Sequence, residues 1–387
     1  MTEVDVAILG GGPAGYTAAL TAAEQGATVA IVESERPGGA CVFHACIPTN
    51  VLLSATQTAL AARELDAVGV LRAGETIAFG PLADRREALV RQVAQGIEAA
   101  LAARKVQLLR ARGGLAGPGR LAQLGDAPNE LRAESIVIAT GSRWERPALP
   151  GVADERVLTP DQVQRLRVPP DSALVLGDGP AETGFALEYA FLLAAAGSAV
   201  TLALPRPRLL MGLDAALDEI AAATLADAGV TVLYGAELTG GEGNALQIRH
   251  RDGTSMVSAE VVVAADPRRP STDGLGLETA GIAGTGTLAV DAGCRAAAPS
   301  LFAAGDVTGG PMLTAAALEQ GRTAGLNATG GAATARLRAL PQVLHLSPAI
   351  GWVGANEATA RAAGYDVCVG TVDLGFNPRA ITQGGRP

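Results

Sequence analysis

Cys41 and Cys46 are the residues of this sequence most able to do chemistry, because they lie five positions apart, after a glycine pair and shortly before a proline. A thiolate is a nucleophile, and two close sulfurs can alternate between dithiol and disulfide without large backbone movement. The spacing predicts a redox-active pair. A zinc site is one alternative, although zinc needs further ligands and His44 is the candidate nearby. A second alternative is that both cysteines are buried free thiols. We expect Cys294 and Cys368 to be ordinary structural thiols.

A glycine-rich turn ahead of the cysteines can hold a dinucleotide. Residues 4–9 are typical of a buried parallel strand, the next six residues read GGGPAG, and a helix is predicted over 14–25. Glycines permit a tight turn and close backbone approach to a pyrophosphate, and a helix N-terminus attracts phosphate. Glu33, after a strand predicted over 28–32, can accept hydrogen bonds from a ribose diol. A glycine turn used only for packing is the alternative. The residues assigned to this site are Gly10, Gly12, Gly15 and Glu33.

A second strand–turn–helix unit repeats the first. A strand is predicted over 173–176, a glycine turn follows at 177–179, and a helix is predicted over 186–196 before another strand at 199–204. Two such units are typical of a protein that holds two dinucleotides. The sequence therefore predicts an α/β fold with two Rossmann-like domains.

Composition limits the partners of the chain. Among 387 residues the net charge is -9 and there are four cysteines. An acidic surface argues against nucleic acid, and so few cysteines argue against a secreted disulfide scaffold. No apolar run approaches the roughly 20 residues of a membrane helix, and no signal sequence is visible. We therefore expect a cytoplasmic protein with neither a nucleic-acid nor a membrane partner.

Residues 38–50, which read GGACVFHACIPTN, resemble the G-G-T-C-x-N-x-G-C-I-P-S-K stretch of the flavin-dependent pyridine nucleotide-disulfide oxidoreductases. The resemblance continues in order through ATG at 139–141, RPSTDGL at 269–275, AAGDV at 303–307 and PAIGWVG at 348–354. Because it covers nearly the whole chain, it implies the family's fold, with FAD and NAD(P) as cofactors.

The resemblance also implies a division into domains. Residues 1–146 and 271–337 would form an FAD-binding domain in two parts, 147–270 an NAD(P)-binding domain, and 338–387 the start of an α+β dimerisation domain. Within the FAD domain, Glu33 would hold the adenosine ribose. The other residues implied to line the flavin are Gly39, Gly113 near the adenine, Thr140, Gly141, Gly305, Asp306 at the ribityl or phosphate region, Met312 and Leu313.

The implied chemistry is hydride transfer from NAD(P)H through FAD to the cysteine pair. Cys46 would face the flavin as a thiolate, and Cys41 would attack a small disulfide substrate. Asn50 stands where the family has a lysine that pairs with a glutamate near the flavin. Glu188 matches that glutamate, so we expect both residues at the cofactor site and expect Glu188 to lack its charge partner.

The second nucleotide turn is irregular. Gly177 and Gly179 are assigned to NAD(P), but Glu182 takes the third glycine position and would repel a pyrophosphate. A ribose-binding glutamate is replaced by Leu204, and Arg206 and Arg208 follow, which suits the 2′-phosphate of NADPH unless both are surface arginines. NADPH and NADH both stay open.

The C-terminal segment lacks the family's His-Pro motif, since none of His44, His250 and His345 precedes a proline. We expect slow disulfide reduction as a result, with His44 as a hypothetical replacement acid, and a homodimer weakened by the short segment. The predicted function is an FAD-dependent reductase of a small disulfide. A diaphorase-like NAD(P)H:quinone reductase and a flavin-binding protein with little activity are the alternatives.

Overall fold

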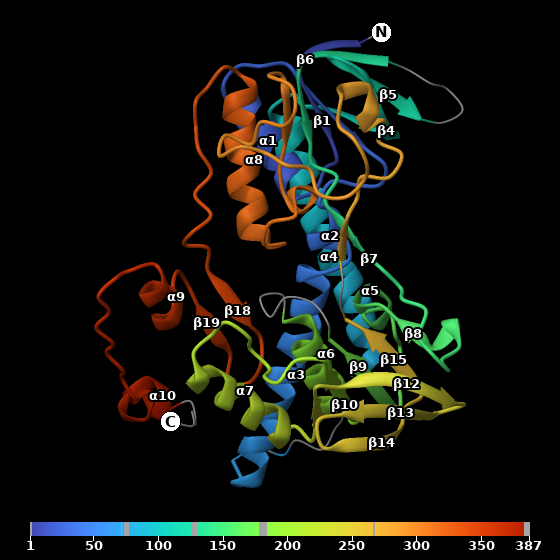
Figure 1. The fold of residues 1–387 in the computed structure, drawn as a ribbon, viewed down its shortest axis with the longest axis vertical. Coiled ribbons are helices and arrows are strands. Elements are labelled where there is room, and N and C mark those ends of the chain that lie inside the picture. The colour runs from blue at the N-terminus through green and yellow to red at the C-terminus, as the bar shows by residue number, and fades with distance from the viewer. Residues whose placement is uncertain are drawn as a thin grey trace.

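The computed structural model describes residues 2–70, 72, 77–124, 130–177, 184–265 and 268–382. Two α/β units lie one above the other along the long axis, and a smaller C-terminal segment lies beside the lower one (Figure 1). The predicted α/β fold with two Rossmann-like units is confirmed. The predicted domain boundaries at 146/147 and 270/271 lie next to two crossing strands, which pair antiparallel between the units: β7 (Ser142–Trp144) and β16 (Arg268–Pro270).

The upper unit is built on a seven-stranded sheet in the order β3-β2-β1-β6-β5-β4, with β17 beside β6. Its central strands are parallel and almost wholly buried, as expected for apolar runs covered on both faces. The strands are β1 (Thr2–Leu9), β2 (Val29–Glu33), β3 (Gln107–Arg110), β4 (Arg112–Gly117), β5 (Arg120–Leu124), β6 (Glu130–Ile138) and β17 (Leu301–Ala303). Gly113, which the resemblance places near the adenine, lies in β4, which begins after a break at Ala111.

Two helices from opposite ends of the sequence pack together on this sheet, α1 (Pro13–Glu24) and α8 (Thr314–Ala328). Their contact surfaces consist of small residues. A Cβ added to Gly321 would lie 2.4 Å from the carbonyl oxygen of Ala14, and one added to Gly325 would lie 2.6 Å from that of Ala18. Glycine therefore lets the two backbones approach closely enough for α8 to begin beside the α1 turn.

The lower unit has a five-stranded parallel sheet in the order β11-β10-β9-β15-β8, with a three-stranded antiparallel sheet beside it. Helix α6 is apolar on nearly every side and buried in the core of this unit, with Glu188 as its one charged residue. The elements are β8 (Val157–Leu158), α5 (Pro160–Val163), β9 (Ser172–Leu176), α6 (Phe185–Ala195), β10 (Ala199–Leu204), α7 (Ala215–Asp227), β11 (Thr231–Tyr234), β12 (Glu237–Glu242), β13 (Ala245–His250), β14 (Gly253–Ser258) and β15 (Val261–Ala264).

Three helices connect the two units: α2 (Gly39–Phe43), α3 (Cys46–Ala67) and α4 (Phe79–Ala103). Helix α4 begins at Phe79, and the buried side chains of Phe79 and Leu82 belong to its apolar face. By length and composition alone, 39–67 is one stretch that could cross a membrane. Here it packs against α4 and α6 instead, with Leu52 and Leu53 in the core of the lower unit.

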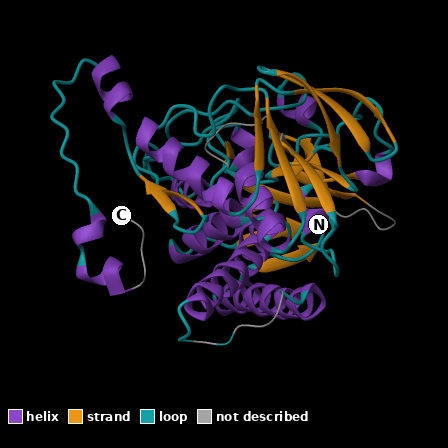
Figure 2. Cartoon of the chain, turned by 90° about the horizontal axis from the view of Figure 1, so that it is seen from below, coloured by secondary structure: helices purple, strands orange, loops and turns teal. Residues whose placement is uncertain are grey.

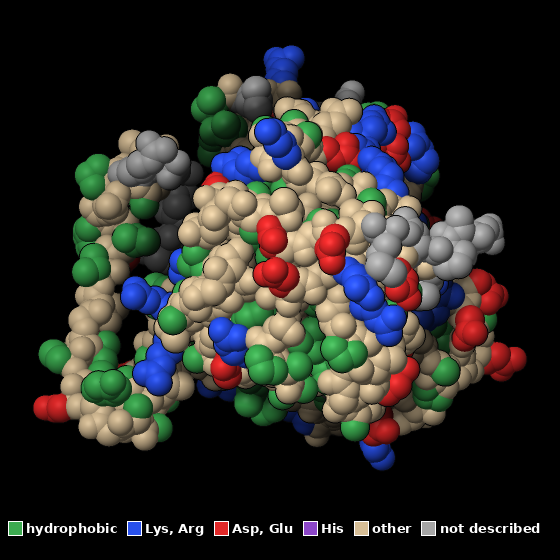
Figure 3. Space-filling model, turned by 90° about the horizontal axis from the view of Figure 1, so that it is seen from above, with side chains coloured by type: hydrophobic (Ala, Val, Ile, Leu, Met, Phe, Trp, Pro, Cys, Tyr) green, Lys and Arg blue, Asp and Glu red, His purple; other side chains and the backbone are tan. Residues whose placement is uncertain are grey.

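The C-terminal segment contains the paired strands β18 (Gln342–Leu344) and β19 (Ile350–Trp352), then α9 (Glu357–Ala362) and α10 (Pro378–Thr382). Four short 3-10 helices complete the described elements: Asp154–Arg156, Leu277–Ala280, Asp306–Thr308 and Leu374–Phe376. Strand β18 packs on the lower unit, whereas the part after β19 extends away from it (Figure 2). On the face seen from above, Lys and Arg side chains are interspersed with Asp and Glu (Figure 3).

Candidate active site

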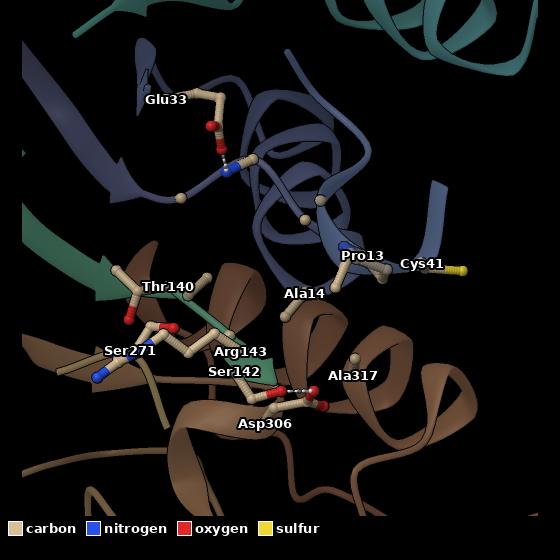
Figure 4. Close-up of a pocket in the computed structure, with 18 of the residues that line it drawn as sticks. Pro13, Ala14, Glu33, Cys41, Thr140, Ser142, Arg143, Ser271, Asp306 and Ala317 are labelled. Carbon is tan, nitrogen blue, oxygen red and sulfur yellow. Dashed lines mark hydrogen bonds between the residues drawn. The ribbon is translucent and has the colours of Figure 1, made fainter. Parts of the chain in front are cut away.

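A cavity of about 500 Å³ lies at the carboxyl ends of β1 and β6, where parallel strands of such sheets bind ligands. Figure 4 shows Glu33 at one end of it and Cys41 at the other, with α1 between them. Most of the predicted flavin site is therefore brought together in one place. The predicted residues that line the cavity are Gly10, Gly12, Glu33, Gly39, Cys41, Cys46, Gly113, Thr140, Gly141, Gly305, Asp306 and Met312.

The glycine turn combines packing with an open helix end. A Cβ on Gly15 would lie 1.9 Å from the carbonyl oxygen of Gly10, so the absence of a side chain at Gly15 lets the helix pack against the turn. Gly15 does not line the cavity. Gly12 is the N-cap of α1 and provides no side-chain cap. A Cβ on Gly39 would lie 2.6 Å from the Cα of Gly12. The backbone N–H groups that begin α1 thus face a cradle with room for a pyrophosphate.

The Glu33 carboxylate is held at the adenosine end of this cradle. Its Oε2 accepts a hydrogen bond from the backbone N–H of Gly11 at 2.7 Å, and its Oε1 accepts one from that of Glu35 at 2.8 Å. Two backbone donors fix the carboxylate while leaving further lone pairs for a ligand. This geometry fits the predicted contact with a ribose diol.

Polar groups line the opposite wall. Thr140 Oγ1 is buried and has no hydrogen-bond partner among the described residues, which is the state expected of a group that awaits a polar ligand. Asp306 accepts hydrogen bonds from Ser142 Oγ at 2.6 Å and Arg268 Nη2 at 2.7 Å. Arg268 was missed by the sequence analysis, although it directly precedes the motif at 269–275. Together with the cradle, these groups fit an FAD molecule.

The cysteines meet the cavity from two consecutive helices, Cys41 in α2 and Cys46 as the first residue of α3. Both are free thiols. Thr314, the first residue of α8, lies within hydrogen-bond distance of both sulfurs, with its Oγ1 3.2 Å from Cys46 Sγ and 3.3 Å from Cys41 Sγ. This residue was also missed, because no local pattern connects it with the cysteines.

The two thiols differ in acidity. The hydrogen bond from Cys41, with help from Thr314 and the nearby charge of Arg268, lowers the pKa of Cys46 to about 6. The same hydrogen bond to Cys46, together with burial, raises the pKa of Cys41. At neutral pH the negative charge therefore resides on Cys46 and the proton on Cys41. This direction agrees with the predicted roles of the pair.

The zinc alternative has no ligand set in the part of the chain that the structure describes, because no three His, Cys, Asp or Glu side chains gather there. His44 lines the cavity beside the cysteines, with its Nε2 3.9 Å from Glu35 Oε2. Its Nδ1 is buried and has no hydrogen-bond partner among the described residues. This position is compatible with the hypothesis of a replacement acid, which stays a prediction.

The expectation that Glu188 lacks a charge partner is wrong. Its Oε1 accepts hydrogen bonds from both the backbone N–H and the Nδ1 of His345, each at 2.8 Å. Glu188 is buried in α6, and His345 directly follows β18. The hydrogen bond to Glu188 raises the pKa of His345. Asn50 is exposed on α3, and neither Asn50 nor Glu188 lines the cavity.

Three of the residues predicted to bind NAD(P), Gly177, Arg206 and Arg208, do not line the cavity. Gly177 directly follows β9 at a tight contact, where an added Cβ would lie 2.6 Å from that of Ala186. Gly179 and Glu182 fall outside the described residues. Arg208 Nε lies 3.6 Å from Asp218 Oδ2, and Arg206 also has an interaction partner. Leu313 is the N-cap of α8 and does not line the cavity either.

Comparison with known proteins adds independent evidence. The family model for pyridine nucleotide-disulphide oxidoreductases matches residues 4–321. The chain belongs to this family. It is 32% identical to the dihydrolipoyl dehydrogenase of Thermus scotoductus, over all of this chain and 83% of that protein. It is 30% identical to a Bacillus subtilis dihydrolipoyl dehydrogenase, over 99% and 84% of the two chains.

Comparison with solved structures supports the same family assignment. LpdA of Mycobacterium tuberculosis superposes with a TM-score of 0.88 at 28% identity, covering all of this chain and 85% of its own. The HOCl-induced flavoprotein disulfide reductase RclA of Escherichia coli, as its Cu(II) complex, gives 0.84 at 26% identity, covering 99% and 84%. The chain is thus an NAD(P)H-dependent flavoprotein disulfide oxidoreductase, and the predicted cofactors FAD and NAD(P) are confirmed at the level of the family.

Proposed function

We propose that the chain reduces a small disulfide with electrons that pass from NAD(P)H through FAD to Cys41 and Cys46. The observation that carries this proposal is the pair of unequal thiols at the cavity, with one hydroxyl in reach of both sulfurs. When bound, FAD would supply the hydride acceptor and return an electron pair to the oxidised cysteines.

The cysteines then perform two exchanges. Cys41 gives its proton to the Cys46 thiolate and attacks one sulfur of the acceptor, so that a mixed disulfide forms and the first thiolate leaves. Cys46 gives up that proton and attacks the Cys41 sulfur, which releases the second thiolate and forms the Cys41–Cys46 disulfide. One released thiolate takes the proton that Cys46 gives up and the other takes a proton from water, and the acceptor gains two electrons in total.

Thr314 and Arg268 position this chemistry. The Thr314 hydroxyl can donate its single hydrogen to whichever sulfur carries the charge. The positive charge of Arg268 lowers the pKa of Cys46. His44 lies where it could protonate a leaving thiolate. The homodimer and the cytoplasmic location stay predictions from the sequence, and the sequence favours neither a particular disulfide nor one of the two nucleotides decisively.

An anaerobic titration of the flavin-loaded chain with NADPH and NADH, in parallel, tests the proposal. We expect two-electron reduction to produce a long-wavelength thiolate–flavin absorbance that is lost in Cys46→Ser and kept in Cys41→Ser. Flavin bleaching without that band, followed by transfer to a quinone but not to a disulfide, would support the diaphorase alternative. Bound FAD that neither nucleotide reduces would support the flavin-binding alternative.

A further inference from the structure

Glu188 and His345 form a hydrogen-bonded pair beside α3, the helix that begins with Cys46, and the His345 side chain is 38% exposed. Glu188 has a side chain only 7% exposed and is reached by two donors of the same residue, the backbone N–H and the imidazole Nδ1 of His345. Both donors converge on one oxygen, Oε1, which fixes the imidazole relative to the carboxylate. A buried carboxylate is costly unless it is paired, so the imidazole offsets the cost of burying Glu188.

Helix α3 holds both partners in place. Thr49, three residues after Cys46, lies 3.0 Å from the hydroxyl of Tyr189, the neighbour of Glu188. Gln57 donates to the carbonyl of Leu346, the neighbour of His345, at 2.8 Å. The helix that begins with Cys46 therefore contacts the residue next to Glu188 and the residue next to His345.

The strand that carries His345 is anchored as well. Leu344 and Leu346 are buried in the core of the lower unit together with Leu52 and Leu53 of α3. Since side chains alternate along extended chain, His345 points away from these leucines and toward Glu188. The pair is thus positioned by three elements, α3, α6 and β18.

Cys46 is the first residue of α3, one turn before the Thr49 contact with Tyr189. We propose that His345, as an imidazolium bound to Glu188, is a positioning residue that offsets the Glu188 charge and so lets Cys46 ionise. The inference rests on the proposed function, in which Cys46 is the thiolate. It assigns a role to a histidine of the C-terminal segment that lies 157 residues from its partner.

The electrostatics follow the geometry. Glu188 from α6 and the Cys46 thiolate from α3 both raise the pKa of His345, so the imidazole is charged below that raised value and loses its charge as pH rises through it. The other groups that act on the two sulfurs are Arg268, Asp306, Thr314 and, from α1, Tyr16. Asn50, one turn after Cys46 on α3, is neutral and contributes no charge.

The test measures the pKa of Cys46 from the pH dependence of its alkylation by iodoacetamide. The full chain carries Cys41→Ser, Cys294→Ser and Cys368→Ser, which leaves one of the four cysteines. His345→Gln should raise the Cys46 pKa by about half a unit or more, because it removes the imidazolium and leaves the Glu188 charge with neutral donors alone. His345→Lys, which keeps the charge, and the neutral pair His345→Gln/Glu188→Gln should both return it toward the value of the parent.

A Cys46 pKa that is unchanged in folded His345→Gln protein would overturn the proposal. If that variant does not fold, the pKa of His345 is measured instead, by NMR titration of the full chain. If the His345 charge affects Cys46, the Cys46 charge must affect His345 equally. With three histidines in the sequence, His44→Gln and His250→Gln assign the His345 signal. Its pKa should fall in Cys46→Ser, and an unchanged value would refute the coupling. Neither measurement needs NAD(P)H or an acceptor, so the outcome is independent of the proposed turnover.

Discussion

The Thr314 hydroxyl should set much of the acidity of Cys46. Thr314→Val keeps the shape of the side chain and removes the one hydroxyl that lies 3.2 Å from Cys46 Sγ. A hydrogen bond to a charged group contributes about 1.5–3 kcal/mol, and one pKa unit corresponds to about 1.4 kcal/mol. We therefore expect the Cys46 pKa to rise by about one unit from its value of about 6.

The thiolate fraction shows the size of the effect. With a pKa of about 6, roughly nine-tenths of Cys46 is ionised at pH 7, and a rise of about one unit reduces this to about half. The assay is the pH dependence of alkylation in the reduced protein. The flavin-loaded chain should also need a higher pH to develop its thiolate–flavin absorbance.

A matched control lies on the same helix. Thr323 is fully buried in α8, and its hydroxyl has no hydrogen-bond partner among the described residues. Thr323→Val should therefore leave the Cys46 pKa at its original value. The reasoning is refuted if Thr314→Val does not move the pKa while the variant keeps its fold, or if Thr323→Val moves it equally.

Two further predictions concern the cofactor cradle and its support. Glu33→Gln keeps an oxygen for the Gly11 N–H but removes the charge, and the dissociation constant of FAD should rise about tenfold, measured by flavin fluorescence during reconstitution; an unchanged constant would contradict the assigned role. Gly321→Ala should lower stability by about 1–3 kcal/mol in denaturant unfolding, because the added methyl group meets the Ala14 carbonyl at 2.4 Å. Gly96→Ala, in an exposed part of α4 with nothing within 4 Å, should instead raise stability by about 0.5–1 kcal/mol, and equal effects at the two sites would count against the packing argument.

The missed residues share one cause. Thr314 meets Cys46 across 268 positions, His345 meets Glu188 across 157, and Arg268 meets Asp306 across 38. Threonine, histidine and arginine occur in many surroundings, so residue type alone does not indicate these contacts. The wrong expectation for Glu188 has the same origin, because it assumed a partner at one position of the family motif, whereas the fold brings the imidazole of His345 to the carboxylate from the segment after β18.

The sequence by itself determined the features that depend on local spacing. Strand, glycine turn and helix around Gly10 follow from short-range periodicity and from backbone conformations that glycine permits, and the Cys41–Cys46 interval indicated a redox pair before any fold was known. Only the tertiary structure decided which thiol is acidic and what balances Glu188. The acidity of Cys46 depends on hydrogen bonds from α2 and α8 and on a charge from β16, and the partner of Glu188 comes from the segment after β18. The distances between these groups are set by packing between elements that lie far apart in the chain.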